Sequence, residues 1–272
     1  MDSIIHVVSI IIIFIIVMPI AEYLDSKWRD FLDSISKNTN SEVQTKASNN
    51  DKYNEEDTNS NETQIFFTKD TTSESQEEIL LNNLGINYIF HMTHINNLSS
   101  ILQNGLLSHN NNFVNIDISN KEVNDRRNSI EPIYYRNIHS YVPFYFNPKN
   151  AMLYSKKGIQ DYIIILAVDR TLIYQHNSLF TDGNAASNVT KFYNDLTKIN
   201  NLNWDCINAK TWFDIEDGKR MRMAEILVFN SIETKYIQKI YCNNYKAKQY
   251  IINLVTINKL NIKVEINSNL FF

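Results

Sequence analysis

The segment from Tyr88 to Leu107 constrains the fold most, because it carries the signals of a strand and of a helix in direct succession. A β-rich stretch ends in His91, and Gly105 provides a stop signal for the helix that follows. Apolar residues recur between these two points on one helical face: Ile95, Leu98, Ile101 and Leu102. A histidine between a strand and a helix belongs to the core in most proteins, so His91 alone does not define a site.

Charge divides the 272-residue chain into two parts. Residues 1–80 contain 6 Lys/Arg and 15 Asp/Glu (6 − 15 = −9), whereas residues 81–272 contain 20 and 15 (20 − 15 = +5). A mildly basic domain tolerates a nucleic-acid partner but does not prove one. Residues 37–80 are polar and acidic, contain no Gly or Pro, and predict a disordered linker. The two cysteines, Cys206 and Cys242, form no disulfide framework and suit a reducing compartment.

The residues from Ser3 to Ala21 carry no formal charge and are mostly Ile or Val. As a helix they would span roughly 28 Å, close to the thickness of a bilayer core. Lys27 and Arg29 follow this run, which predicts a membrane anchor within residues 1–36 with its C-terminal side in the cytoplasm. A cleaved signal peptide, or a buried or mis-started segment, is the alternative. We therefore expect a membrane-anchored protein whose domain of residues 81–272 is cytoplasmic.

Two neighbouring arginines, Arg126 and Arg127, lie at the end of an expected helix, Lys121–Arg127. Such a pair usually faces solvent, but in a nucleotide site it could hold phosphate or a developing anion. Farther along, Tyr145 and Tyr154 are candidates for stacking on a flat ring, because a tyrosine offers an aromatic face and a polar tip.

Glu225 begins an apolar strand, where a carboxylate needs a partner. Either an ion pair, for example with Arg222, or a reacting sugar would satisfy it. Trp204 and Trp212 precede it in an expected loop. They could stack on nucleic-acid bases if exposed, although packing against the core is commoner.

Apolar periodicity predicts the remaining elements. We expect strands at Val142–Phe146, Tyr162–Val168, Met223–Phe229, Ile237–Cys242 and Ile262–Ile266. We expect helices from Ala151, over Val189–Ile199 and over Tyr245–Ile257.

Five segments in order closely resemble the DarT family of DNA ADP-ribosyltransferase toxins, over roughly residues 85–245. They are the His91 segment, Val-Asn-Asp-Arg-Arg, Tyr141-Val-Pro-Phe-Tyr-Phe-Asn-Pro with Met152-Leu-Tyr, Phe180-Thr-Asp-Gly-Asn-Ala-Ala, and Arg222-Met-Ala-Glu-Ile-Leu-Val. Residues 1–80 lie outside the resemblance. It implies an α+β fold with a split, mostly antiparallel sheet and NAD in the cleft, in addition to the N-terminal transmembrane helix predicted above.

The resemblance also implies roles for individual residues. Glu225 and Arg127 would be catalytic. NAD would be held by His91, Met92, Thr93, Ser100, Leu107, Arg127, Tyr145, Met152 and Tyr154. The DNA would be contacted by Arg126, Asp182, Asn184, Trp204, Trp212, Arg220 and Arg222.

The resemblance implies transfer of ADP-ribose from NAD to a base of single-stranded DNA, thymidine in the better-known branch, without a metal. The resemblance also implies a macrodomain antitoxin as a partner. The apolar run predicts a second partner, the membrane, through residues 3–21. Glutamate suits this chemistry because a carboxylate stabilises positive charge that builds on the sugar. An ADP-ribosyltransferase for RNA or protein, or a catalytically silent module that binds NAD or nucleic acid, is the alternative.

Overall fold

The computed structural model describes residues 74–110, 116, 118, 121–175 and 177–272. The chain divides into two units, Met1–Lys69 and Asp70–Phe272, and the described residues all belong to the second. The predicted anchor and most of the predicted linker lie outside the described residues. Helix α3 (Gln76–Asn83) begins within the range assigned to the linker and buries Leu81 completely. Within the described part of the chain, no helix combines the length and apolarity needed to cross a membrane.

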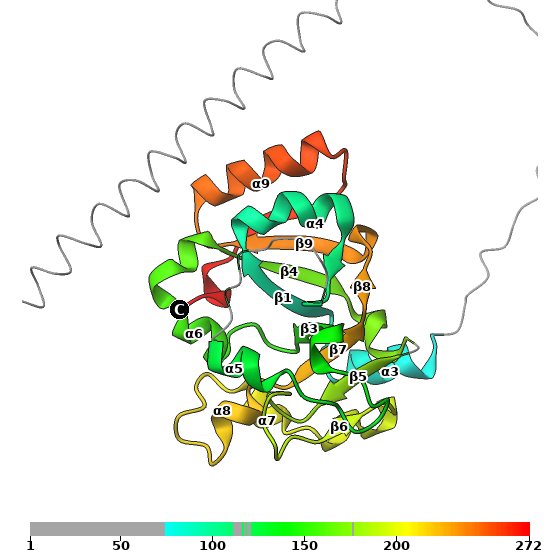
Figure 1. Cartoon of the computed structure of the whole chain (residues 1–272). Coiled ribbons are helices and arrows are strands. Elements are labelled where there is room, and N and C mark those ends of the chain that lie inside the picture. The colour runs from blue at the N-terminus through cyan, green and yellow to red at the C-terminus, as the bar shows by residue number, and fades with distance from the viewer. Residues whose placement is uncertain (1–73, 111–115, 117, 119–120, 176) are drawn as a thin grey trace, which may run out of the picture. The chain divides into compact units, whose positions relative to one another are not determined.

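An eight-stranded sheet organises the second unit, in the order β10-β9-β4-β1-β3-β7-β5-β6 (Figure 1). Its strands are β1 (Tyr88–His94), β3 (Tyr141–Tyr145), β4 (Ile163–Asp169), β5 (Ser178–Thr181), β6 (Phe192–Tyr193), β7 (Glu225–Phe229), β9 (Ile237–Cys242) and β10 (Lys263–Ile266). Neighbours are antiparallel except β9 and β10, which are parallel. Strands β2 (Leu106–Leu107) and β8 (Ser231–Ile232) form a separate antiparallel pair.

The sheet is weakest between β1 and β3. These strands share one residue pair, Phe90 with Tyr145, whereas β1 pairs with β4 along its whole length from Tyr88 to His94. Beyond this single pair the two halves of the sheet diverge. This geometry gives the mostly antiparallel, α+β arrangement predicted from the sequence and leaves space at the junction.

Short helices flank this junction, and one longer helix covers the far end of the sheet. They are α4 (Leu98–Asn104), α5 (Lys121–Arg126), α6 (Ala151–Ser155), α7 (Trp204–Asn208), α8 (Gly218–Met221) and α9 (Tyr245–Ile257). Helices α4 and α9 lie side by side, and α5, α6, α7 and α8 gather around the opposite half (Figure 1). The central strand β4 is the core of the molecule, since Ile163 to Val168 are all buried.

Several predicted elements are confirmed, including β4, β9 and α9. His91 lies in the middle of β1 and not at its end, because pairing with β4 continues to His94. Gly105 ends α4 as expected, with φ at +79°. The predicted helix Val189–Ile199 is wrong: this stretch contains β6 and the start of a 3-10 helix, Leu196–Asn201. Trp204 begins helix α7, where a loop was predicted.

Candidate active site

A cavity of about 530 Å³ opens where β1 and β3 diverge. Its walls come from β1, α4, α5, β3, α6 and α8, so segments far apart in the sequence converge on it. The predicted site residues that line it are His91, Met92, Thr93, Ser100, Leu107, Arg126, Arg127, Tyr145, Met152 and Asn184. The remaining predicted site residues are not among its lining residues: Tyr154, Asp182, Trp204, Trp212, Arg220, Arg222 and Glu225.

Glu225 lies directly behind the cavity wall, bonded to Arg127. Arg127 Nη1 donates to Glu225 Oε2 over 2.7 Å, and Glu225 is fully buried. Burial alone would lower the pKa of the Arg127 guanidinium, but the neighbouring Glu225 carboxylate and its hydrogen bond raise that pKa above its usual value. The ion pair suggested by the sequence therefore exists, but its cation is Arg127 and not Arg222.

The second oxygen of Glu225 is held by the turn that follows β5. The backbone N–H of Ala185 donates to Oε1 over 2.9 Å, and the N–H of Glu225 donates to Thr181 Oγ1 over 3.0 Å. Gly183 is required in this turn because a Cβ there would collide with the Arg220 side chain. The Phe180–Ala186 motif thus fixes the Glu225 carboxylate through Ala185 and the Glu225 backbone through Thr181.

Tyr145 faces the same ion pair from β3. It is the register partner of Glu225 on β7, and it lines the cavity. Burial, followed by the nearby Glu225 carboxylate, raises the pKa of the Tyr145 phenol, so it remains protonated in the physiological range. A neutral aromatic ring beside a carboxylate and a guanidinium can pack against a flat ligand ring.

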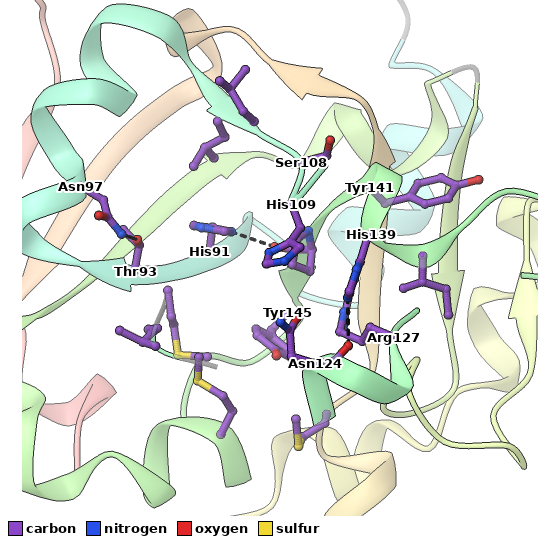
Figure 2. Close-up of a pocket in the computed structure, with 18 of the residues that line it drawn as sticks. His91, Thr93, Asn97, Ser108, His109, Asn124, Arg127, His139, Tyr141 and Tyr145 are labelled. Atoms are coloured by element: carbon purple, nitrogen blue, oxygen red, sulfur yellow. Dashed lines mark hydrogen bonds between the residues drawn. The ribbon is translucent and has the colours of Figure 1, made fainter. Parts of the chain in front are cut away.

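His91 of β1 is held by a contact with β3, on the other side of the junction (Figure 2). Its Nδ1 lies 2.9 Å from the carbonyl oxygen of Pro143, and a carbonyl only accepts, so Nδ1 carries the hydrogen. Burial lowers the pKa of the imidazole, which favours the neutral form. On the neighbouring wall, Asn97 Nδ2 donates to Thr93 Oγ1 over 2.9 Å and locks that hydroxyl in place.

Three basic residues that line the cavity were not among the predicted site residues: Lys219, His109 and His139. The imidazole rings of His109 and His139 lie 4.5 Å apart, and His139 Nε2 lies 2.9 Å from the carbonyl oxygen of Asn124 in α5 (Figure 2). Both histidines also line the cavity, and no Asp or Glu does so among the described residues. His139 lies two residues before the Tyr141 segment and Lys219 three residues before the Arg222 segment, so these segments were a signal, whereas nothing in the sequence marks His109.

Two of the three arginines expected to contact DNA, Arg220 and Arg222, are held by the protein itself. Arg222 is buried and donates to the backbone carbonyls of Lys149, Cys206 and Ile207. Arg220 pairs with Asp182 and Asp217 over 2.7 and 2.6 Å. Arg222 therefore fixes the region around α7, and Arg220 and Asp182 fix the turn beside Glu225. These side chains have structural partners in place of phosphates.

The two tryptophans pack inward. Trp204 donates from Nε1 to the carbonyl of Ile199 and contacts Phe146 edge-on. Trp212 is only 4% exposed, so it offers no free face to a base. Tyr154 lies against Trp212 and is not among the residues that line the cavity, so its place beside NAD stays a prediction.

No group of three or more His, Cys, Asp or Glu in the described part of the chain is arranged to hold a metal ion.

Comparison with known proteins gives consistent matches. The chain matches the family described as "ssDNA thymidine ADP-ribosyltransferase, DarT" over residues 90–272. It is 33% identical over 193 residues to a "DNA ADP-ribosyl transferase-DNA ADP-ribosyl glycohydrolase fusion protein" of Thermosipho africanus, covering 68% of this chain but 49% of the fusion. It is 28% identical to a "DNA ADP-ribosyl transferase" of Thermus sp. (strain 2.9), covering 61% of this chain and 86% of that protein.

Solved structures agree with these matches. Thermus sp. 2.9 DarT in complex with ADP-ribosylated ssDNA superposes with a TM-score of 0.65 at 25% identity, covering 69% of this chain and 97% of that one. The same DarT in complex with NAD+ gives a TM-score of 0.62 at 24% identity, covering 69% and 98%, and shows the shared fold.

The diverging sheet, the cavity at its junction and the buried arginine–glutamate pair are those of an ADP-ribosyltransferase. More narrowly, the chain belongs to the DarT family of ssDNA thymidine ADP-ribosyltransferases. The resemblance identified in the sequence is therefore confirmed.

Proposed function

We propose that this protein transfers ADP-ribose from NAD to a thymine base of single-stranded DNA. The observation that carries this function is the buried Arg127–Glu225 pair directly behind the wall of a cavity large enough for a ligand. The family match indicates the two substrates, NAD and single-stranded DNA. The structure contains the two side chains that the transfer needs.

The cavity suits an anionic dinucleotide. Arg126, Arg127 and Lys219 contribute positive charge to its wall, and no described carboxylate lines it. Arg127 Nη2 is buried and has no hydrogen-bond partner among the described residues, which leaves a donor available to a ligand oxygen. These features fit the pyrophosphate and ribose groups of NAD.

NAD supplies an activated ADP-ribosyl group, since nicotinamide departs as its bond to the ribose breaks. The Glu225 carboxylate stabilises the positive charge that builds on the sugar during this step. Its two oxygens are already held by Arg127 and by the Ala185 N–H, so it needs little reorganisation. The donors that fix Glu225 therefore also preorganise it.

Arg127 stands between Glu225 and the cavity, where it can face an incoming base. The reacting ring nitrogen of thymine carries a proton, and its loss leaves negative charge on the base. A guanidinium stays protonated at physiological pH, so Arg127 acts by stabilising that charge, and the proton passes to solvent water. The raised pKa of Arg127 strengthens this assignment.

The direct test incubates the full chain with NAD and single-stranded oligonucleotides that contain one thymine. Mass spectrometry should find one added ADP-ribose on the oligonucleotide and none when thymine is replaced by cytosine. RNA of the same sequence and a protein mixture serve as competing acceptors. Label on RNA or protein with none on DNA would contradict this function.

We further propose that a partner removing ADP-ribose from DNA, such as a macrodomain antitoxin, holds the enzyme in check. The name of the Thermosipho africanus relative, a fusion of transferase and glycohydrolase, supports this. Co-expression tests it: a DNA ADP-ribosyl glycohydrolase should restore growth to cells that express this chain. If the transferase did not reduce growth, the toxin role would be lost.

We also propose that residues 3–21 anchor the enzyme to a membrane with the catalytic domain in the cytoplasm. The length and apolarity of this run and the basic residues after it support the proposal.

A further inference from the structure

Three aromatic side chains from separate parts of the chain lie exposed beside one another, and none of the three lines the cavity. Tyr154 of α6 is 38% exposed, Phe213 is 65% exposed and Phe272 is 38% exposed. The Tyr154 centroid lies 5.7 Å from Phe213 and 5.1 Å from Phe272. Figure 1 shows the C-terminal end of the chain next to α6. These three residues form an aromatic patch.

The patch is held from below by Trp212. The Trp212 centroid lies 5.1 Å from Phe213 and 5.9 Å from both Tyr154 and Phe272. The N–H of Phe272 donates to Gln160 Oε1 over 2.8 Å, which fixes the backbone there. Rings that are already positioned lose little conformational entropy when a ligand stacks on them.

Two lysines lie over the same rings. Lys157 Nζ is 4.4 Å from the Tyr154 centroid, and Lys149 Nζ is 5.1 Å from the Phe272 centroid. Neither lysine forms a salt bridge with a described residue. Asp214 and Glu216, in the loop that carries Phe213, are also exposed. Because the local charge is mixed, stacking must contribute more than phosphate attraction to any binding here.

The patch continues the cavity wall. Met152 and Ser155 of α6 line the cavity, whereas Tyr154 between them points to the patch. Lys219 of α8 lines the cavity too, and the loop that leads into α8 carries Phe213. A polymer with one unit in the cavity would therefore pass over these rings.

We propose that the aromatic patch binds the nucleotides next to the base that enters the cavity. Their bases stack on Phe213, Tyr154 and Phe272, and Lys149 and Lys157 meet the intervening phosphates. Exposed aromatic rings with nearby cations are the usual platform for single-stranded nucleic acid, since every base has a face to stack. This inference rests on the proposed function, which requires a single strand at the cavity.

The test measures binding of a fluorescent single-stranded oligonucleotide to the full chain, together with its rate of modification. Phe213→Ala should weaken binding about tenfold and raise KM by a similar factor with little change in kcat. Tyr245→Ala is the matched control, because Tyr245 is 68% exposed on α9 outside the patch. The control should bind like the wild-type protein.

A second arm removes the flanking bases and leaves the sugar-phosphate chain. Abasic flanks should weaken binding to the wild-type protein but not to Phe213→Ala. Replacing Lys149 and Lys157 by Gln should reduce the slope of log affinity against log salt concentration by about 1.4, because each lost phosphate contact contributes about 0.7.

Two outcomes would overturn the inference. Equal binding by the wild-type protein and Phe213→Ala, with modification intact in both, would leave the proposed function standing and remove the patch from it. Loss of binding to anionic vesicles in Phe213→Ala, with oligonucleotide binding unchanged, would assign the patch to a membrane surface. If the wild-type protein binds and modifies no oligonucleotide, the proposed function itself fails.

Discussion

At the scale of single residues, Glu225 combines complete burial with two fixed donors. Arg127 and the Ala185 N–H occupy one oxygen each, and Thr181 accepts from the Glu225 backbone. A carboxylate removed from water in this way needs such partners, and losing one leaves a buried group without compensation. The contacts that offset the cost of burying the Glu225 carboxylate also orient it toward the cavity wall.

Glu225→Gln keeps the size of the side chain but removes its charge. We expect kcat for DNA modification to fall by a factor on the order of 10²–10³, because transition-state charge is no longer stabilised. Single-turnover kinetics measure the rate, and circular dichroism checks that the variant folds. Glu233→Gln, at an exposed position, is the control and should retain full activity. A folded Glu225→Gln enzyme that kept more than about a tenth of the rate would contradict this role.

The two adjacent arginines should differ sharply. Arg127 bonds to Glu225 and is mostly buried, whereas Arg126 is exposed at the cavity rim. Arg127→Ala should reduce the modification rate by about a hundredfold or more, and Arg126→Ala should act mainly on KM. Steady-state kinetics on one oligonucleotide separate these effects. Equal losses in kcat would indicate that both arginines hold phosphate.

At the scale of elements, the loop between α5 and β3 depends on one buried acid. Glu131 is fully buried and accepts hydrogen bonds from the backbone N–H groups of Ile133, Tyr134 and Arg136, and from the Tyr141 hydroxyl. Burial, followed by this hydrogen bond, raises the pKa of the Tyr141 phenol. The loop joins Arg127 to the strand that carries Pro143 and Tyr145, so Glu131 braces one wall of the cavity.

Glu131→Ala should lower the free energy of unfolding by about 3 kcal/mol, since three part-buried N–H groups and the buried Tyr141 hydroxyl lose their acceptor. Chemical denaturation of the full chain measures this change. Glu233→Ala removes a glutamate whose side chain is exposed and paired with Lys235, so it should change stability by less than about 0.5 kcal/mol. Similar losses in both variants would mean that the Glu131 hydrogen bonds contribute little.

The elements that sequence patterns predict are those whose signal is local. The continuous apolar run of β4 and the amphipathic pattern of α9 each specify their own structure. The helix predicted over Val189–Ile199 is wrong because Phe192 and Tyr193 pair with β5, and this tertiary contact overrides the helical pattern. The Trp212 side chain likewise follows its neighbours Tyr154 and Phe272, which no window of sequence brings together.

The same distinction between local signals and tertiary contacts applies to the candidate active site. The residue types at Arg127 and Glu225 were identified from motifs, but their pairing joins positions 98 residues apart and depends on the register of β3 with β7. Burial of Arg222 against backbone carbonyls had no sequence signal, since a surface arginine and a structural one look alike. Sequence motifs therefore identify the site residues, whereas the sheet determines which of them contact each other.

At the scale of the whole molecule, the proposed N-terminal anchor predicts where the enzyme acts. Residues 1–30 fused to a reporter should carry it to the membrane with the reporter in the cytoplasm, because the apolar run precedes the basic residues. Membrane fractionation and protease protection measure this. A variant with two Lys placed within residues 3–21 is the control and should release the reporter. A shortened reporter outside the cell would instead identify a cleaved signal.

The geometry of the whole domain also sets the form of DNA it accepts. A base modified on its pairing edge must leave its stack to enter a cavity between β1 and β3, which costs a few kcal/mol in a duplex. The domain charge of +5 from residues 81–272 offers limited phosphate attraction to offset that cost. We therefore expect single-stranded DNA to be modified at least about tenfold faster than duplex of the same sequence.

A graded series of substrates tests this explanation, because the energy needed to expose the base can be varied while the sequence is kept. Thymine in a single strand, in a mismatched pair, in an internal bubble and in a perfect duplex should be labelled at rates that follow the ease of unstacking. The single strand and the bubble should be fastest, and the perfect duplex slowest. Equal rates across the series would mean that the enzyme reads an edge of the base that pairing leaves free, and the proposed attack at the pairing edge would be wrong.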